Sequence, residues 1–199
     1  HYVISCSGYK SVSGDFTVAN GEASIPATVL KVQTAWDGKT YTEPQKGESG
    51  VYLIGSPDEL MWFNKNGKTS DSVKLTADIR INEDVNIEDT SKLYQWTPIG
   101  WYKSYDNYDK YKGTFDGNGH TISGLYIFAK STSADNRASY TGLIGYADNG
   151  SMICNLTISD SLIENRSTAA NRGKNVGAVA GDAYNVENCH VTSSVTVYG

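Results

Sequence analysis

The feature that most constrains this chain is a short apolar pattern that returns at nearly constant intervals. Three segments, 122–127, 153–158 and 186–191, follow the order apolar, two variable residues, apolar, one variable residue, apolar. Their first residues are 31 and 33 positions apart. Two glycine-ended apolar tetrads, 142–145 and 178–181, end 36 positions apart. A period of about 20 to 50 residues indicates a solenoid, in which one structural unit stacks on the next.

The repeated unit contains strands only, because no 3.6-residue apolar period runs between Leu75 and Tyr198. This excludes helical repeats and predicts an all-β fold, a parallel β-helix. The first, fourth and sixth residues of each segment should point inward. Ile122, Ile153 and Val186 would then form one aliphatic column, with about 4.8 Å between successive strands.

Small and amide residues occupy the expected corners between strands. Asn155 and Asn188 share the third position of their segments, so their side chains should pass amide hydrogen bonds from coil to coil. Glycine lets the backbone bend sharply or approach a neighbouring chain closely. Four glycines in and beside the tetrads are therefore predicted to be structural: Gly142, Gly145, Gly177 and Gly181.

One short helix is predicted between residues 56 and 67. Ser56 is a suitable N-cap, Pro57 suits the first helical position, and Glu59 completes a capping box with Ser56. Gly67 offers a left-handed stop. A single amphipathic helix beside many strands needs a surface to cover, and we expect it to cap an exposed sheet edge or coil end.

The chain divides by its pattern into two parts. Residues 1–33 contain short β-prone runs and too little sequence for a stable sheet domain, so they are predicted to end a preceding module or to cap the β-helix. Residues 34–199 form the β-helix domain. The last residues, 195–199, stop within a strand-like pattern, and we expect the domain to be truncated there.

Composition excludes several classes of function. The 199 residues carry a net charge of -5, so no basic face for nucleic acid can be assembled. No run of eighteen apolar residues occurs, which excludes a transmembrane helix. Three scattered cysteines, Cys6, Cys154 and Cys189, support neither a disulfide framework nor a zinc site. Cys189 is expected to lie in the core and Cys154 to face outward.

Several runs together resemble the coils of GLUG-motif β-helix proteins. They are Trp96–Gly100, Tyr111–Leu125, the two tetrads with their following segments, and the upstream runs Gly50–Ile54, Pro57–Phe63 and Val73–Ile79. The resemblance covers about residues 34–199. It implies a right-handed β-helix on a bacterial cell surface, as in adhesins of gut Bacteroidetes. It implies no catalytic site, because the family motif is structural.

Catalysis and metal binding must be considered because β-helices also host pectin lyases and polygalacturonases. Those chemistries need converging carboxylates, but the acids here occupy different phases of the repeat and lie mostly in turns. The run Asp116–Gly119 has the composition of a calcium loop and equally that of a simple turn. We therefore predict no catalytic residue, no metal site and no cofactor, with calcium at 116–119 left open.

Residues 101–111 are the best candidate for recognition. Their four tyrosines and one tryptophan in a polar stretch resemble the aromatic surfaces that bind sugars or proteins. The alternative is that the rings pack on the outside of the coil. The candidate ligand-binding residues are Trp101, Tyr102, Tyr105 and Tyr108.

These observations predict a non-catalytic surface module that acts as an adhesin or stalk. Its expected partner is a host glycan or extracellular protein, and it should be monomeric within a longer chain, outside the cell or on its surface. Two alternatives remain open. One is a polysaccharide lyase or hydrolase of the β-helix class, and the other is a spacer beside a catalytic domain.

Overall fold

The computed structural model describes residues 2–4, 12–15, 18–19, 22–23, 34–104, 107–130, 140–167 and 175–199. They belong to two compact units, His1–Thr34 and Ala35–Gly199. The first unit contains two antiparallel strand pairs. Strand β1 (Tyr2–Ile4) pairs with β2 (Val12–Gly14), and β3 (Val18–Ala19) pairs with β4 (Glu22–Ala23).

The second unit is built from parallel sheets. The largest has the order β21 (Val186–Glu187), β16 (Met152–Cys154), β11 (Thr114–Asp116), β7 (Val73–Leu75), β6 (Tyr52–Ile54) and β5 (Gln45–Lys46). A second contains β22 (His190–Val191), β17 (Thr157–Ser159), β12 (Thr121–Ser123) and β8 (Ile79–Arg80). A third contains β13 (Tyr126–Ala129), β18 (Leu162–Asn165) and β23 (Thr196–Tyr198).

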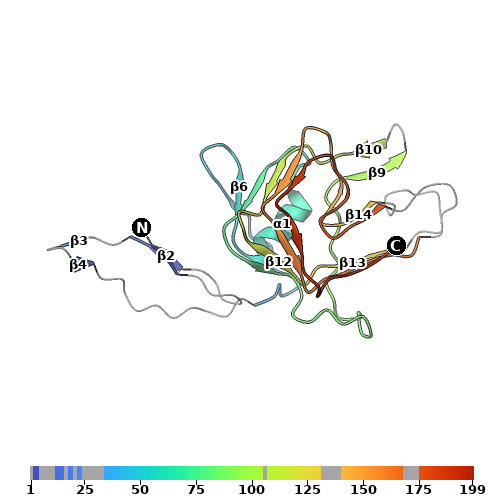
Figure 1. The fold of residues 1–199 in the computed structure, drawn as a ribbon, viewed down its shortest axis with the longest axis horizontal. Helices are drawn as coiled ribbons and strands as arrows, with labels where there is room; N and C mark the ends of the chain where they lie inside the picture. Colours follow the sequence, from blue (N-terminus) through green and yellow to red (C-terminus); the bar gives the residue numbers. More distant parts are fainter. Residues whose placement is uncertain are drawn as a thin grey trace. The chain divides into compact units, whose positions relative to one another are not determined.

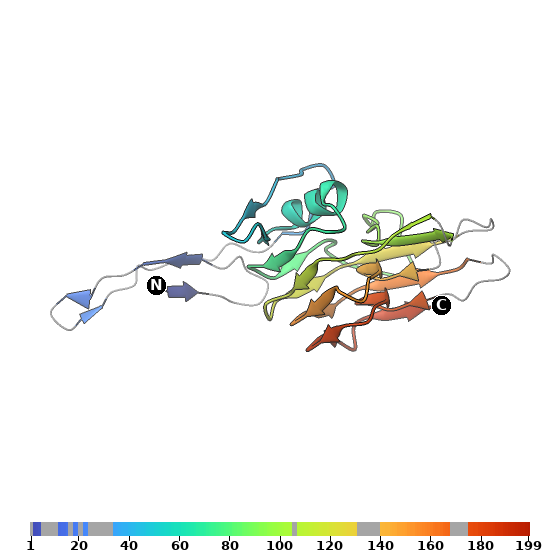
Figure 2. The same ribbon diagram turned by 90° about the horizontal axis from the view of Figure 1, so that it is seen from above.

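Two smaller parallel pairs of strands follow the strands of the third sheet along the chain. They are β14 (Tyr140–Thr141) with β19 (Asn175–Val176) and β15 (Ile144–Tyr146) with β20 (Ala180–Asp182). From β11 onward the chain therefore visits the first, second and third sheets in the same order and returns beside its starting strand. Figure 2 shows the successive turns, which we call coils, lying side by side in sequence order. Among the described strands of these sheets, only β5 runs antiparallel to its neighbour, at the edge of the largest sheet.

The core is a set of aliphatic columns that run from coil to coil. Ile79, Ile122, Ile158 and Val191 are successive partners in the second sheet. The first three side chains are at most 1% exposed. Each therefore has an aliphatic neighbour in the next coil, and this continuity explains why β-branched residues recur at a fixed phase.

The prediction that Ile122 shares a column with Ile153 and Val186 is wrong. Ile153 and Val186 are partners, but the residue opposite Ile153 in the preceding coil is Phe115. Ile122 instead pairs with Ile158, because segment 122–127 joins the second sheet to the third, whereas segment 153–158 joins the first sheet to the second. One spacing of apolar residues thus serves two different corners.

The last coil departs from the predicted burial. The apolar pattern predicts that Val186 and Val191 point into a closed core, yet they are 45% and 50% exposed. Each lies on a strand with one neighbour in its sheet, so one side of its side chain has no coil against it. Cys189, which the sequence predicts to lie in the core, packs against it but is only half-buried.

Helix α1 (Pro57–Asn66) lies in the connection between the parallel strands β6 and β7, at the end of the stack formed by the earliest coils (Figure 2). The Ser56 side chain accepts from the Glu59 backbone N–H, but Glu59 Oε2 accepts from the Gly55 N–H. The left-handed stop at Gly67 is wrong, since its φ is -64°. Glycine is needed because a Cβ would lie 2.7 Å from the Phe63 carbonyl.

The apolar face of α1 enters the core. Its buried residues are Pro57, Leu60, Met61 and Phe63, and Leu60 is completely inaccessible. The Phe63 ring contacts Tyr52 edge-on at 5.5 Å between centroids. Helix α1 thus covers apolar residues that the first coil would otherwise expose, which agrees with a capping role.

The predicted amide ladder is present and has an acid in its first position. Asn188 Nδ2 donates to Asn155 Oδ1 at 2.9 Å, and Asn155 Nδ2 donates to Asp116 Oδ1 at 3.0 Å. Asn155 and Asn188 both have positive φ, 54° and 49°, a conformation that asparagine tolerates better than most residues. The ladder therefore serves two purposes, since it links three coils and permits the backbone to turn.

The four tetrad glycines lie where backbones touch. A Cβ at Gly142, Gly145 or Gly181 would lie 2.4–2.7 Å from a backbone atom of another segment, and a Cβ at Gly177 would lie 2.3 Å from the Ala180 carbonyl oxygen of its own turn. At Gly145, for example, the nearest atom is the Gly100 carbonyl oxygen at 2.4 Å. A larger residue would push neighbouring segments apart or distort the turn at these points, so the glycine requirement is steric.

Candidate functional site

The aromatic segment forms a hairpin inserted into one coil. Isolated bridges place Ile99 opposite Ile144 and Tyr111 opposite Ala147. Ile99 and Tyr111 are twelve positions apart along the chain, whereas their partners in the next coil are three positions apart. The nine extra residues include β9 (Trp101–Ser104) and β10 (Asn107–Asp109), an antiparallel pair that projects from the stack (Figure 1). The neighbouring coil keeps its register on either side of the insertion.

Gly100 starts this excursion. Its φ of +75° is costly for a residue with a side chain, and a Cβ there would lie 2.2 Å from the Tyr146 carbonyl oxygen. The backbone thus leaves the core at a point where only glycine fits against the next coil. This contact fixes the direction in which Trp101 leaves the stack.

One face of the hairpin borders a groove that ends at α1. The groove has a volume of about 420 Å³. Its lining comes from the C-terminal end of α1, the three residues after that helix, the segment 97–100 and both ends of the hairpin: Phe63, Asn64, Gly67, Lys68, Thr69, Thr97, Pro98, Ile99, Gly100, Trp101 and Asp109. Trp101 and Asp109 are register partners, so they enter the groove from adjacent strands.

Polar contacts hold the walls of this groove. The Thr69 hydroxyl donates to Asp109 Oδ1 at 2.7 Å and joins the hairpin to the segment after α1. Asn64 Nδ2 donates to the Thr97 carbonyl at 2.7 Å and joins the helix to segment 97–100. The groove is therefore braced at both sides before any ligand arrives.

Tyr108 lies on the other face of the hairpin, since successive strand residues alternate. Its ring contacts Tyr146 at 6.4 Å between centroids, and Tyr146 in turn lies 4.8 Å from Tyr140. Lys110 Nζ lies 4.7 Å from the centre of the Tyr146 ring and 3.4 Å from an Asp148 oxygen. Hydrogen bonding to Tyr146, and then to Asp148, raises the pKa of Lys110. The three tyrosine rings therefore pack against one another, and the Tyr146 ring also packs against the ammonium group of Lys110.

The candidate aromatic residues do not all share one surface. Trp101 borders the groove, whereas Tyr108 packs toward Tyr146 and remains 50% exposed. Tyr102 lies in β9 opposite Tyr108. Tyr105 lies outside the described residues.

Sequence reasoning missed the polar groove residues Asn64, Thr69 and Asp109. Asn64 belongs to α1, Thr69 follows that helix, and Asp109 ends the hairpin. Only the position of α1 against the hairpin brings the three together, and no local pattern in the sequence signals it.

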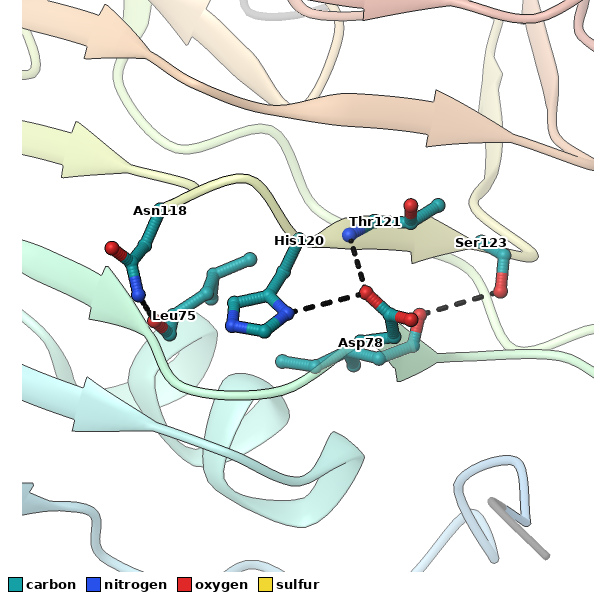
Figure 3. A network of polar contacts seen from close by, with 7 residues as sticks. Leu75, Asp78, Asn118, His120, Thr121 and Ser123 are labelled. Atoms are coloured by element: carbon teal, nitrogen blue, oxygen red, sulfur yellow. Dashed lines mark hydrogen bonds and ion pairs between the residues drawn. The ribbon is translucent and has the colours of Figure 1, made fainter. Parts of the chain in front are cut away.

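A second polar network joins two successive coils at the second sheet (Figure 3). Asp78 Oδ1 accepts from the Thr121 backbone N–H at 2.9 Å and lies 3.3 Å from His120 Nδ1. Beside it, Asn118 Nδ2 donates to the Leu75 carbonyl and the Ser123 hydroxyl donates to the Ile79 carbonyl. Each contact links one coil to the next, so the network has a structural role.

In the run 116–119, where the sequence leaves calcium binding open, Asp116 is engaged by hydrogen bonds within the fold. Asp116 Oδ1 accepts from the Asn118 N–H at 2.8 Å as well as from Asn155. Burial raises the pKa of Asp116, but the hydrogen bonds from Asn155 and Asn118 outweigh it and hold the pKa below its ordinary value of 3.8. Within the part of the chain that the structure describes, no three His, Cys, Asp or Glu side chains gather as a metal site requires.

The surroundings of the two described cysteines favour the thiol over the thiolate. Burial raises the pKa of Cys154, and the neighbouring Asp116 carboxylate raises it further. Burial likewise raises the pKa of Cys189. Because the thiolate is the reactive form, neither residue resembles a nucleophile at neutral pH.

Comparison with known proteins shows a similarity to a large archaeal protein. The chain is 28% identical over 184 positions to halomucin of Haloquadratum walsbyi, a match that covers 85% of this chain and 2% of halomucin. No protein-family model matches the chain, and no solved structure matches it. Among the described residues, no helix has the length and apolar character needed to cross a membrane.

Proposed function

We propose that this chain is a non-catalytic module of a cell-surface protein, built as a right-handed parallel β-helix of the GLUG type. In this proposal it acts as an adhesin or stalk and binds a host glycan or extracellular protein beside the β9–β10 hairpin. The observation that carries the binding proposal is the braced groove that Trp101 borders.

The fold proposal is supported by the coil-to-coil registers. Residues paired between β12 and β17 are 36 positions apart in the sequence, and residues paired between β17 and β22 are 33 positions apart. Connections between parallel strands of one sheet are right-handed in about 98% of known cases. A right-handed coil is therefore the arrangement that these sheets favour.

The surface location is supported by similarity to halomucin, whose name denotes a mucin. The chain corresponds to a small part of that protein, so the activity of the whole is not transferred. A net charge of -5 suits a solvated exterior module.

The binding proposal can be tested on arrays of glycans and mucins. We expect Trp101→Ala to weaken binding at least tenfold, because an aromatic ring in a recognition groove supplies a large share of the contact area. Tyr108→Ala should have a smaller effect, because that ring is packed toward Tyr146. The matched control is Tyr184→Ala, which removes a ring that is 68% exposed between β20 and β21. Equal binding by all four proteins would refute the proposal.

The enzyme alternative makes a separate prediction. A lyase or hydrolase would release unsaturated sugars or new reducing ends from pectin or host glycans. Asp148 contacts Lys110, and Asp116 belongs to the ladder, so these acids already have partners within the fold. A spacer, in contrast, would show neither product release nor array binding.

A further inference from the structure

We propose that the groove beside Trp101 selects sugars that carry an acetamido group. This inference rests on the proposed function and adds the chemical class of the ligand. The groove volume of about 420 Å³ lies within the usual range for small-molecule sites, about 300–1,000 Å³. The space suits a short saccharide better than a folded protein surface.

The apolar part of the groove fits a methyl group and the face of a pyranose ring. Pro98, Ile99 and Trp101 line it, over the buried Phe63 ring. Sugar rings place C–H groups against aromatic faces, and a methyl group gains further from apolar contact. A plain hexose has no such methyl group to bury.

Two of the polar lining residues carry opposite charges, Asp109 as an acceptor and Lys68 as a donor. Asp109 Oδ1 holds the Thr69 hydroxyl, and a carboxylate has further lone pairs for a second donor. Lys68 is an exposed cation in the same lining. An acetamido group has an N–H for Asp109 and a carbonyl for Lys68, with its methyl group beside them.

The same charges count against other sugars. A uronic or sialic acid carboxylate would gain from Lys68 but would be repelled by Asp109. A neutral hexose would offer hydroxyl groups to both but would leave the apolar wall without a partner. Of these three classes, the acetamido sugar alone matches the acceptor, the donor and the apolar wall together.

Saturation-transfer NMR with the full chain can test this inference. The probes are N,N′-diacetylchitobiose, a disaccharide of N-acetylgalactosamine, cellobiose and glucuronic acid. We expect both acetamido sugars to bind at least tenfold more tightly than cellobiose and their methyl protons to receive the strongest saturation. The two acetamido arms distinguish a chitin-like from a mucin-like source.

Variants locate the binding. Asp109→Ala and Lys68→Ala should each weaken binding of the preferred acetamido sugar about tenfold or more. Asp148→Ala is the matched control, since it removes a carboxylate from the other side of the hairpin. Urea unfolding of each variant separates loss of binding from loss of fold.

The possible failures are distinguishable. If the chain binds array glycans but does not prefer acetamido sugars, the inference fails and the proposed function stands. If acetamido sugars bind equally to wild type and to Asp109→Ala of normal stability, the groove is the wrong site. If the chain binds no glycan, both the preference for acetamido sugars and the proposed binding of glycans are refuted.

Discussion

The amide ladder allows a stability prediction with an internal reference. Asn155 and Asn188 have nearly the same backbone conformation, with φ of 54° and 49°, but different hydrogen bonds. Asn155 donates to the Asp116 carboxylate and accepts from Asn188. Asn188, at the end of the ladder, donates to Asn155, and its Oδ1 lies 3.3 Å from His190 Nε2. Replacing each asparagine with alanine therefore tests the carboxylate bond against a common background.

The expected loss in the free energy of unfolding follows from the backbone conformation and the hydrogen bonds of each asparagine. Alanine in the left-handed conformation costs about 1–2 kcal/mol, and this cost is the same at both sites. A neutral hydrogen bond contributes about 0.5–1.5 kcal/mol and one to a charged group about 1.5–3 kcal/mol. Asn155 is partly exposed and Asn188 is exposed in the last coil, so we take the lower part of these ranges at both sites. We expect about 2 kcal/mol of destabilisation for Asn188→Ala and about 3 kcal/mol for Asn155→Ala.

Urea unfolding measured by circular dichroism would give both values. A double-mutant cycle of Asn155→Ala with Asp116→Ala should give a coupling energy of about 1–2 kcal/mol, because the two side chains touch directly. Equal destabilisation at both asparagines, with a coupling energy within about 0.3 kcal/mol of zero, would refute the reasoning. The ladder would then be a passive consequence of the turn.

Three further predictions concern the core, the pH dependence and the thiols. Ile122→Ala should lower the free energy of unfolding by about 2–5 kcal/mol, because Ile122 is fully buried between Ile79 and Ile158. Val191→Ala, in the same column but 50% exposed, should cost less than about 1 kcal/mol in the same urea titration. Because the pKa of Asp116 is lowered on folding, its contribution is present above pH 3.8 and is lost as the pH falls through the folded value. Asp116→Asn should flatten the stability profile there, and an unchanged profile would contradict the assignment. Cys154 should react with iodoacetamide much more slowly at pH 7.5 in native protein than in urea, as mass spectrometry of its peptide would report.

The class of architecture is predictable from the sequence because strand periodicity and solenoid stacking both leave a regular apolar spacing. Parallel sheets, one capping helix and the amide ladder between Asn155 and Asn188 are all indicated by local patterns. The alignment of coils is not, because the same apolar spacing occurs at two corners. Only the backbone hydrogen bonds show that Ile122 lies opposite Ile158.

The candidate site is predictable only in part. The aromatic run identifies residues 101–111 as a candidate for recognition, since tyrosines and a tryptophan in a polar segment are locally visible, but it does not predict that they form a hairpin. Strand alternation then divides the run, so that Trp101 and Tyr108 face different neighbours. Asp109 and Thr69 lie 40 positions apart, and no local pattern could have paired them. The contact between Asp78 and His120 was missed for the same reason.

The hairpin insertion has a consequence for how such a protein can change. Nine residues enter between Ile99 and Tyr111, yet the bridges on either side keep their partners in the next coil. We therefore expect that the length and composition of the inserted segment can vary without disturbing the pairing of the two coils. An engineer could therefore exchange this hairpin for a foreign peptide to be displayed, whereas the corresponding segment of the next coil, β15, is paired with β20 and offers no such position.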